Sequence, residues 1–464
     1  MGTAAPDAPR APQEGAGSGN RTPLRERRRE QRGWYFYDWA NSVFSTSVLT
    51  VFLGPYLTSV TEAAADADGY VHPLGIPVRA GAFFPYAVSA SVLLSVLVMP
   101  LAAAFADRTG RKKPLLGAAA YLGAGATTGM YFLDGDRYLL GGVLLVVANV
   151  SYAVSIVLYH AFLPQIAPPE ERDAVSSRGW AFGYGSGALV LVANLGLFLG
   201  HESLGVAEST AVRICLSSAG VWWAVFTVVP LLRLRERPAA HPAAGAGRTG
   251  PGQGFRQLAG TFRQLRRHPL TLLFLLAYLL YNDGIQTVIT QASVYGSEAL
   301  GLDQTTLIGA ILLVQVLAVA GALLLGRLAA RYGAKRTILG SLVAWTATVG
   351  GGYFLPREDP LWFYALAAGI GLVLGGSQAL SRSLFSHLVP AGKEAEYFAL
   401  YEISDRGTSW LGPLVFGLTY QLSGDYRNAI LSLVVFFALG FVLLLRVPVQ
   451  RAAAAVGNVA PDRI

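Results

Sequence analysis

Long apolar runs, separated by short and mostly basic connections, recur along this chain of 464 residues. A helix of about 20 apolar residues crosses the hydrocarbon core of a bilayer, and each run reaches that length. The sequence therefore predicts an all-α polytopic membrane protein with twelve transmembrane helices. The predicted spans are 35–60, 81–105, 114–133, 138–165, 177–200, 211–232, 269–296, 305–327, 335–355, 360–386, 396–421 and 427–446.

The composition excludes an ordinary soluble enzyme. Hydrophobic residues make up 53% of the chain and charged residues only 14%, whereas soluble domains carry about 25% charged residues. The single cysteine, Cys215, excludes an internal disulfide and a cysteine-based metal site. No nucleotide-binding loop, catalytic triad or metal-ligand cluster stands out in the sequence. We therefore expect no enzymatic activity, no cofactor and no metal.

The basic residues predict the orientation of the chain in the membrane. The formal net charge is +8, and because this charge lies in short loops we interpret it as a topology signal and expect no nucleic-acid partner. With the N-terminus inside, only five of the 36 Lys and Arg residues fall in outer loops. Such an excess on the inner side places both termini in the cytoplasm. The preference for Arg, Ala and Gly is typical of GC-rich genes and favours a bacterial plasma membrane.

The chain divides into five segments. Residues 1–33 are rich in Ala, Gly and Pro and then in charge, which predicts a disordered cytoplasmic tail. Two six-helix halves, 34–232 and 269–447, flank a cytoplasmic linker at 233–268, and a C-terminal tail follows at 448–464. Within the linker, the piece FRQLAGTFRQLRRH has apolar residues at helical spacing between basic ones. This spacing predicts an amphipathic helix on the inner membrane surface.

Matching loops indicate that the two halves are repeats. The connection after the second span, ADRTGRKK, aligns with AARYGAKR after the eighth, so that Gly110 matches Gly333. Pro168 and Pro390, in the loops after the fourth and tenth spans, align at nearly the same offset. Parallel repeats are an architecture of secondary transporters, whose substrate site lies between the halves near mid-membrane. The twelve helices are therefore expected to form two pseudo-symmetric six-helix halves.

The loop ADRTGRKK resembles the signature loop of the major facilitator superfamily, and five further stretches of the chain together carry a more specific family resemblance. In chain order these five are GWYFYDWANSVF, RGWAFGYGSG, YNDGIQT, GSQALSRSLFSHLVP and EYFALYEISDRGTSWLGPLVFG. This set resembles the vacuolar-effluxer-like branch of the major facilitator superfamily, related to the fungal autophagy-linked vacuolar amino-acid exporter. The resemblance implies the major facilitator fold and the export of small solutes, for which neutral amino acids are the expected example.

The resemblance also implies that the loop after the second span latches the two halves and tunes the inward–outward equilibrium. Its residues are Asp107, Arg108, Gly110, Arg111 and Lys112. Gly110 would reverse the chain, and Asp107 could pair with the neighbouring cations or with the N-terminus of a neighbouring helix. The second-half copy of the loop lacks the acid, so we expect it to form a weaker latch.

Ionisable residues within the spans are the main candidates for binding solute and protons, because their insertion is costly and they usually face the bundle interior. Asp283 lies near the middle of span seven, with Asn282 and Gln286 beside it. Gly284 would allow the helix to loosen locally and expose backbone groups to a substrate. The alternative is that Asp283 is a structural acceptor that caps neighbouring helices.

Asp38 occupies the matching first span, with Asn41 three residues further on. It is a candidate for proton coupling, or it pairs with Arg32 or another inner cation. Gln378 in span ten is expected to line the cavity. A lone histidine near an inner helix end, His160, is expected to be structural.

Span eleven carries Glu402, Asp405 and Arg406. Glu402 and Arg406 are four residues apart and can form an ion pair on one helix face, so this cluster either binds solute or neutralises itself. Arg382, in span ten, either binds a substrate carboxylate, pairs with Asp405, or serves as a latch.

These observations predict a secondary active transporter that moves a small polar or zwitterionic solute by alternating access. Amino acids, export and proton coupling are the expected substrate class, direction and driving force. The partners would be the solute, protons and the lipid bilayer, and the protein is expected to be a monomer. The alternative is a solute-binding membrane sensor or a lipid flippase built on the same fold.

Overall fold

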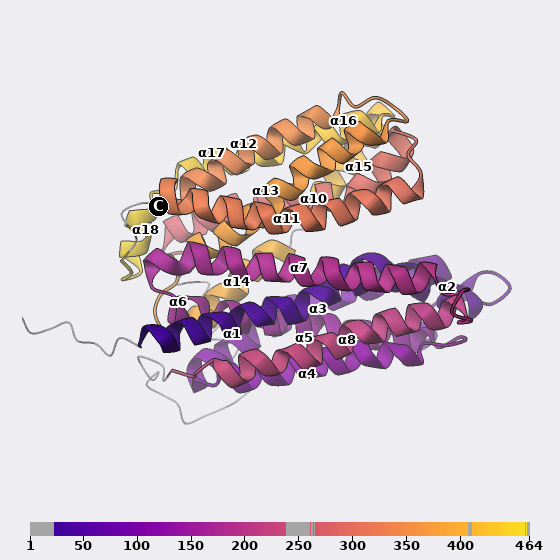
Figure 1. Ribbon diagram of the computed structural model, residues 1–464, viewed down its shortest axis with the longest axis horizontal. Helices are drawn as coiled ribbons and strands as arrows, with labels where there is room; N and C mark the ends of the chain where they lie inside the picture. The colour runs from indigo at the N-terminus through magenta and orange to yellow at the C-terminus, as the bar shows by residue number, and fades with distance from the viewer. Residues whose placement is uncertain are drawn as a thin grey trace, which may run out of the picture.

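The computed structural model describes residues 23–237, 265–406 and 411–459, together with Gly260, Arg263 and Pro461. The helices lie along a common axis in two bundles, and Figure 1 shows the first half in indigo to magenta below the second half in orange to yellow. The predicted amphipathic helix of the linker falls mostly outside the described residues, as do residues 1–22 of the predicted tail.

The first half consists of six long helical segments. The first segment is continuous but changes from an α-helix to a π-helix and back, and a short strand pair follows it. The elements are α1 (Leu24–Val43), η1 (Phe44–Phe52), α2 (Leu53–Ala63), β1 (Tyr70–Val71), η2 (Pro73–Gly75), β2 (Val78–Arg79), α3 (Ala80–Thr109), α4 (Lys112–Gly129), η3 (Met130–Phe132), α5 (Tyr138–His160), α6 (Leu163–Ile166), η4 (Pro169–Glu171), α7 (Arg172–Leu199) and α8 (Glu208–Arg233).

The second half repeats this plan. Its fifth segment is described as two helices, α14 and α15, with residues 407–410 between them outside the described part. The elements are α10 (Pro269–Val294), η5 (Tyr295–Ala299), α11 (Gln304–Tyr332), α12 (Ala334–Gly352), α13 (Pro360–Ser386), α14 (Glu394–Arg406), α15 (Leu411–Ser423), α16 (Tyr426–Ser432), α17 (Val434–Leu445) and α18 (Val449–Ala455).

The predicted all-α membrane architecture is confirmed. Nine helical segments of the described chain are long and apolar enough to cross a membrane. The three further predicted spans correspond to α4, α12 and the α14–α15 pair, which are helical but do not reach that length and apolarity. The two aligned loops also share their backbone turn, because Gly110 and Gly333 both have a positive φ, of 66° and 91°. Glycine adopts this region without a steric penalty.

One end of the bundle collects both ends of the described chain, because the start of α1 and helix α18 lie there (Figure 1). We call it the basic end, and it also holds the loops at 108–113 and 331–336. The predicted tail boundary at residue 33 differs from the structure, since α1 already begins at Leu24. Ion pairs explain this early start: Arg27 contacts Glu171 at 2.7 Å and Glu30 contacts Arg237 at 2.7 Å.

Three glycines of α7 let it pack closely against α1. A side-chain carbon at Gly179 would lie 2.6 Å from Asp38 Oδ2, and one at Gly187 would lie 2.8 Å from Thr46 Oγ1. Gly183, one turn from each, faces the same helix. The close packing places the polar face of α1 next to the interface between the halves.

Candidate functional site

A cavity of about 780 Å³ lies between the two halves. Helices α1, η1, α5 and α7 of the first half and α10, α11, α13 and α14 of the second half line it. Arg382 and Glu402 lie at its floor, towards the basic end, whereas Ser293 and Phe363 line it near the opposite end. The cavity therefore extends from mid-bundle towards the end that is remote from the basic loops.

Arg382 joins the halves at the floor of the cavity. It comes from α13 of the second half, is 1% exposed, and inserts its guanidinium into a pocket of the first half. Both terminal nitrogens donate to Asp38 Oδ2 at 3.4 Å, while Nε donates to Ser176 Oγ at 2.9 Å. Tyr159 OH donates to the same Asp38 oxygen at 2.6 Å. The guanidinium also lies over the Trp34 ring, 4.6 Å from its centroid.

A second charged cluster lies beside the first, on α14. Arg406 Nε donates to Glu402 Oε2 at 3.2 Å, which is the ion pair that the four-residue spacing predicted. Tyr278 OH donates to Asp405 Oδ1 at 3.0 Å. The Arg406 guanidinium lies 4.9 Å from the centroid of the Tyr152 ring, which belongs to the first half. The cluster thus places one cation and two anions together in the cavity wall.

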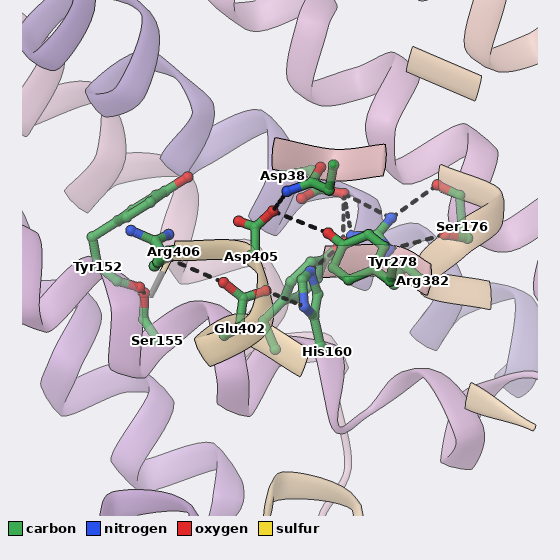
Figure 2. A network of polar contacts seen from close by, with 12 residues as sticks. Asp38, Tyr152, Ser155, His160, Ser176, Tyr278, Arg382, Glu402, Asp405 and Arg406 are labelled. Carbon is green, nitrogen blue, oxygen red and sulfur yellow. Dashed lines mark hydrogen bonds and ion pairs between the residues drawn. The ribbon is translucent and has the colours of Figure 1, made fainter. Parts of the chain in front are cut away.

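His160 connects the two clusters (Figure 2). Its Nδ1 lies 3.1 Å from Glu402 Oε1, and its Nε2 lies 3.1 Å from Arg382 Nη1. The sequence interpretation of His160 as a structural residue missed this position. Helical spacing offered a signal, because Tyr152, Ile156 and His160 are four residues apart and all three line the cavity.

The loop after α3 forms an ion pair within the first half and further contacts with the second half. Lys112 Nζ lies 2.9 Å from Asp107 Oδ1 and 2.7 Å from Glu394 Oε2. The backbone N–H of Glu396, in the first turn of α14, donates to Asp107 Oδ2 at 2.9 Å. Asp107 therefore meets both kinds of partner that its position predicted, a cation and a helix N-terminus.

The remaining loop residues and the second-half copy differ from this arrangement. Arg111 is exposed and Arg108 is half-buried. Lys335, the counterpart of Lys112, donates to the carbonyls of Leu445 and Val447 at 3.0 and 2.7 Å. These carbonyls belong to the second half itself, so Lys335 ties down the end of α17 within its own half.

Additional contacts close the basic end below the cavity floor. Arg172 Nη1 donates to the carbonyl of Ser386 at 3.0 Å, and Ser383 Oγ donates to Asp173 Oδ1. His387, which follows the spanning part of α13, lies 3.4 Å from Arg172 Nη1 through its Nδ1. Burial and then the Arg172 charge lower the pKa of His387 to about 3, so this histidine stays neutral near physiological pH.

Asp283 lies outside the cavity lining, in the packing between α10 and α15. Its side chain is buried, and Oδ2 accepts a hydrogen bond from the backbone N–H of Gly412 at 2.6 Å. Gly412 is in the first turn of α15, so the contact matches the alternative of a structural cap. The expected loosening at Gly284 is wrong: α10 is continuous from Pro269 to Val294. The missing side chain of Gly284 instead makes room for Phe436, 3.0 Å from where a Cβ would lie.

The other candidates fall into two groups. Asn41, Gln286 and Gln378 line the cavity. Asn282 does not line it but donates to Asp405 Oδ1 and so holds that carboxylate in place. Among the described ion pairs, Asp38 contacts Arg382, which joins the two halves.

The chain is similar to a family of known membrane proteins. The family model described as "Vacuole effluxer Atg22 like" matches residues 26–457. An uncharacterized MFS-type transporter of Bacillus subtilis (strain 168), YxiO, is 29% identical over 427 residues, which cover 90% of this chain and 95% of that protein. Autophagy-related protein 22 of Coccidioides immitis (strain RS) is 29% identical over 534 residues, covering 91% of this chain and 87% of that protein.

A similar solved structure comes from the same superfamily. It is the major facilitator superfamily transporter FucP in the outward conformation, with a TM-score of 0.64 and 13% sequence identity. The match covers 90% of this chain and 98% of that chain. At this identity the likeness concerns the fold alone, and it confirms the predicted major facilitator fold with its two halves around a central cavity.

Proposed function

Because this chain belongs to the vacuole effluxer Atg22-like family and has the major facilitator fold, we propose that it exports a small polar or zwitterionic solute, such as an amino acid, coupled to protons. The Bacillus subtilis relative is described as an MFS-type transporter, which supports a transporter and not an enzyme. The observation that carries the finer proposal is the cavity between the halves, whose wall presents Asp405 and Arg406 side by side.

The dimensions and chemistry of the cavity fit a small zwitterion. Its volume of about 780 Å³ lies within the range of small-molecule sites, about 300–1,000 Å³. Arg406 would bind a carboxylate and Asp405 an ammonium group, because the two oppositely charged side chains follow each other on α14. The amides of Asn41, Gln286 and Gln378 would donate and accept hydrogen bonds along the same wall.

The contacts between the halves support alternating access. Arg382 with Asp38, Lys112 with Glu394, and Arg172 with the Ser386 carbonyl all close the basic end. The cavity instead extends towards the opposite end. The excess of basic residues in the loops of the closed end favours a cytoplasmic location for it and for both termini, in a bacterial plasma membrane. The structure then represents an outward-facing state, and a single chain encloses the whole cavity, which supports a monomer.

Proton coupling is proposed for the charged network at the floor, in which Asp38, Glu402 and Asp405 supply the carboxylates. Asp38 contacts Arg382 and Glu402 contacts His160 across the halves, and the movement of the halves would displace both partners, whereas Asp405 contacts Tyr278 within the second half. Ionisable groups that are costly in the membrane usually mark substrate or proton pathways. Export would follow if the outward-facing state releases solute outside and the protein then binds a proton before it changes to the inward-facing state.

The test is flux through the purified chain in proteoliposomes, with each standard radiolabelled L-amino acid as a probe under an imposed pH gradient. We expect flux of at least one probe that collapses with the gradient. Arg406→Gln should abolish it, whereas Arg446→Gln, an exposed arginine at the end of α17, should leave it unchanged. A probe that binds but never moves under any gradient would refute transport and favour the sensor alternative.

A further inference from the structure

We propose that His160 is the proton-binding residue of the transport cycle and that Arg382 and this proton compete for the same ring nitrogen. This inference rests on the proposed proton-coupled transport and names the residue at which the coupling occurs. A proton that reaches His160 through the cavity would displace Arg382 and release the closed basic end.

The hydrogen-bond chemistry fixes the protonation state of His160 in this structure. The guanidinium of Arg382 is always a donor and never an acceptor. Its Nη1 lies 3.1 Å from His160 Nε2, so this nitrogen must carry a lone pair and no proton. The ring proton of a neutral histidine then sits on Nδ1, which lies 3.1 Å from Glu402 Oε1. His160 is therefore neutral as long as Arg382 occupies its pocket.

The charges change when the halves separate at the basic end. Asp38 and His160 belong to the first half, whereas Arg382, Glu402, Asp405 and Arg406 belong to the second half. These four charged side chains of the second half, two cations and two anions, cancel among themselves. Asp38 loses the guanidinium that contacts it in the described ion pairs, and a proton on Nε2 of His160 would restore neutrality to the first half. Opening of the basic end and proton binding at His160 therefore favour each other.

The surroundings of His160 contain several titratable groups, which the test must separate from it. Its neighbours on α14 are Tyr401, Glu402, Asp405 and Arg406, those on α10 and α5 are Tyr278 and Tyr159, and Asp38 and Arg382 face it from α1 and α13. The ring itself lines the cavity, so protons from the open side of the cavity can reach it.

The direct test measures the opening of the basic end as a function of pH, without any solute. Spin labels would be placed by Glu170→Cys and Ala330→Cys, two exposed positions on opposite halves, in a Cys215→Ala background. Pulsed electron–electron double resonance then gives the distance distribution between the two labels, and from it the ratio of open to closed chains. Because the open state binds one more proton, this ratio should rise as pH falls, by up to about tenfold per pH unit. A wild-type ratio that is independent of pH between 5 and 8 would overturn the proposal.

A neutral substitute for the histidine isolates its contribution. His160→Gln keeps an oxygen that accepts from Arg382 and an amide that donates to Glu402, but it binds no proton in this pH range. We expect the pH dependence of the opening ratio to disappear in this variant and to persist in His72→Gln, which alters an exposed histidine in the loop between the first two spans. A wild-type slope in His160→Gln would assign the proton to another group and contradict the proposal.

Flux separates this inference from the proposed function. Proton-driven flux of an amino-acid probe that remains at the wild-type level in His160→Gln would refute the role of His160 while transport stands. If no probe moves through the wild-type protein, the proposed function fails, and the spin-label measurement still decides whether His160 controls the basic end.

Discussion

Gly179→Ala tests how closely the floor of the cavity is packed in the closed state. The added carbon would lie 2.6 Å from Asp38 Oδ2, 2.7 Å from the Trp34 ring and 3.1 Å from Arg382 Nη2. Overpacking of this kind costs about 1–3 kcal/mol. Arg382 fills the space beside Asp38 and Trp34 in the closed state, so we expect the cost to fall mainly on the state in which the basic end is closed. The closed-to-open ratio should fall by about 5- to 150-fold, at about 1.4 kcal/mol per factor of ten.

The matched control is Gly196→Ala on the same helix, where no atom lies within 4 Å of the added carbon. Alanine gains about 0.5–1 kcal/mol of helix propensity over glycine, and the control measures this gain without the contact. The assay is the distance distribution between spin labels across the basic end, with thermal unfolding as a check that both variants fold. If both variants open the basic end equally, the close approach of Gly179 to the Asp38–Arg382 pair does not control the closure.

Three further predictions address other contacts. Asp107→Asn keeps an acceptor for the Glu396 N–H of the second half but removes the charge that strengthens this hydrogen bond. The same spin labels should therefore report more opening, by about 1 kcal/mol. An unchanged ratio would show that this contact is no latch. Asp283→Ala leaves the Gly412 N–H without its carboxylate partner and should lower the unfolding free energy by about 1–3 kcal/mol. Asp283→Asn keeps an acceptor and should retain wild-type stability and flux. Loss of proton-driven flux in a stable Asp283→Asn protein would return Asp283 to the coupling mechanism. The pKa of His387 is about 3 in the folded chain, below the unfolded value of about 6.5. The unfolded state therefore binds the proton better, and the stability of the folded chain falls as pH drops below about 6.5, by about 2 kcal/mol at pH 5. His387→Gln should reduce the difference in melting temperature between pH 8 and pH 5, and an unaltered difference would contradict this.

The membrane class, the turn at Gly110 and the ion pair on α14 could be predicted because they depend on local sequence. Apolar run length alone determines whether a helix can span a bilayer. The turn at Gly110 and the ion pair between Glu402 and Arg406 depend on residues within one or two turns of each other, so spacing predicted them correctly.

The partners of the buried charges depend on contacts that are remote in sequence. Asp283 looked like the central acid because of its depth in span seven, yet packing turns it towards Gly412 and away from the cavity. Arg382 and Asp38 are 344 residues apart, and no local pattern relates them.

The sequence by itself determined that apolar helices form two related halves, because hydropathy and repeat offset are properties of the chain. Only the tertiary structure decided which charges meet between those halves. Glycines in α7 bring α1 close, α13 inserts Arg382 into the pocket that results, and His160 falls between two charged clusters. Helix packing sets these distances, and a change of one helical turn in any of the three helices would separate the same residues.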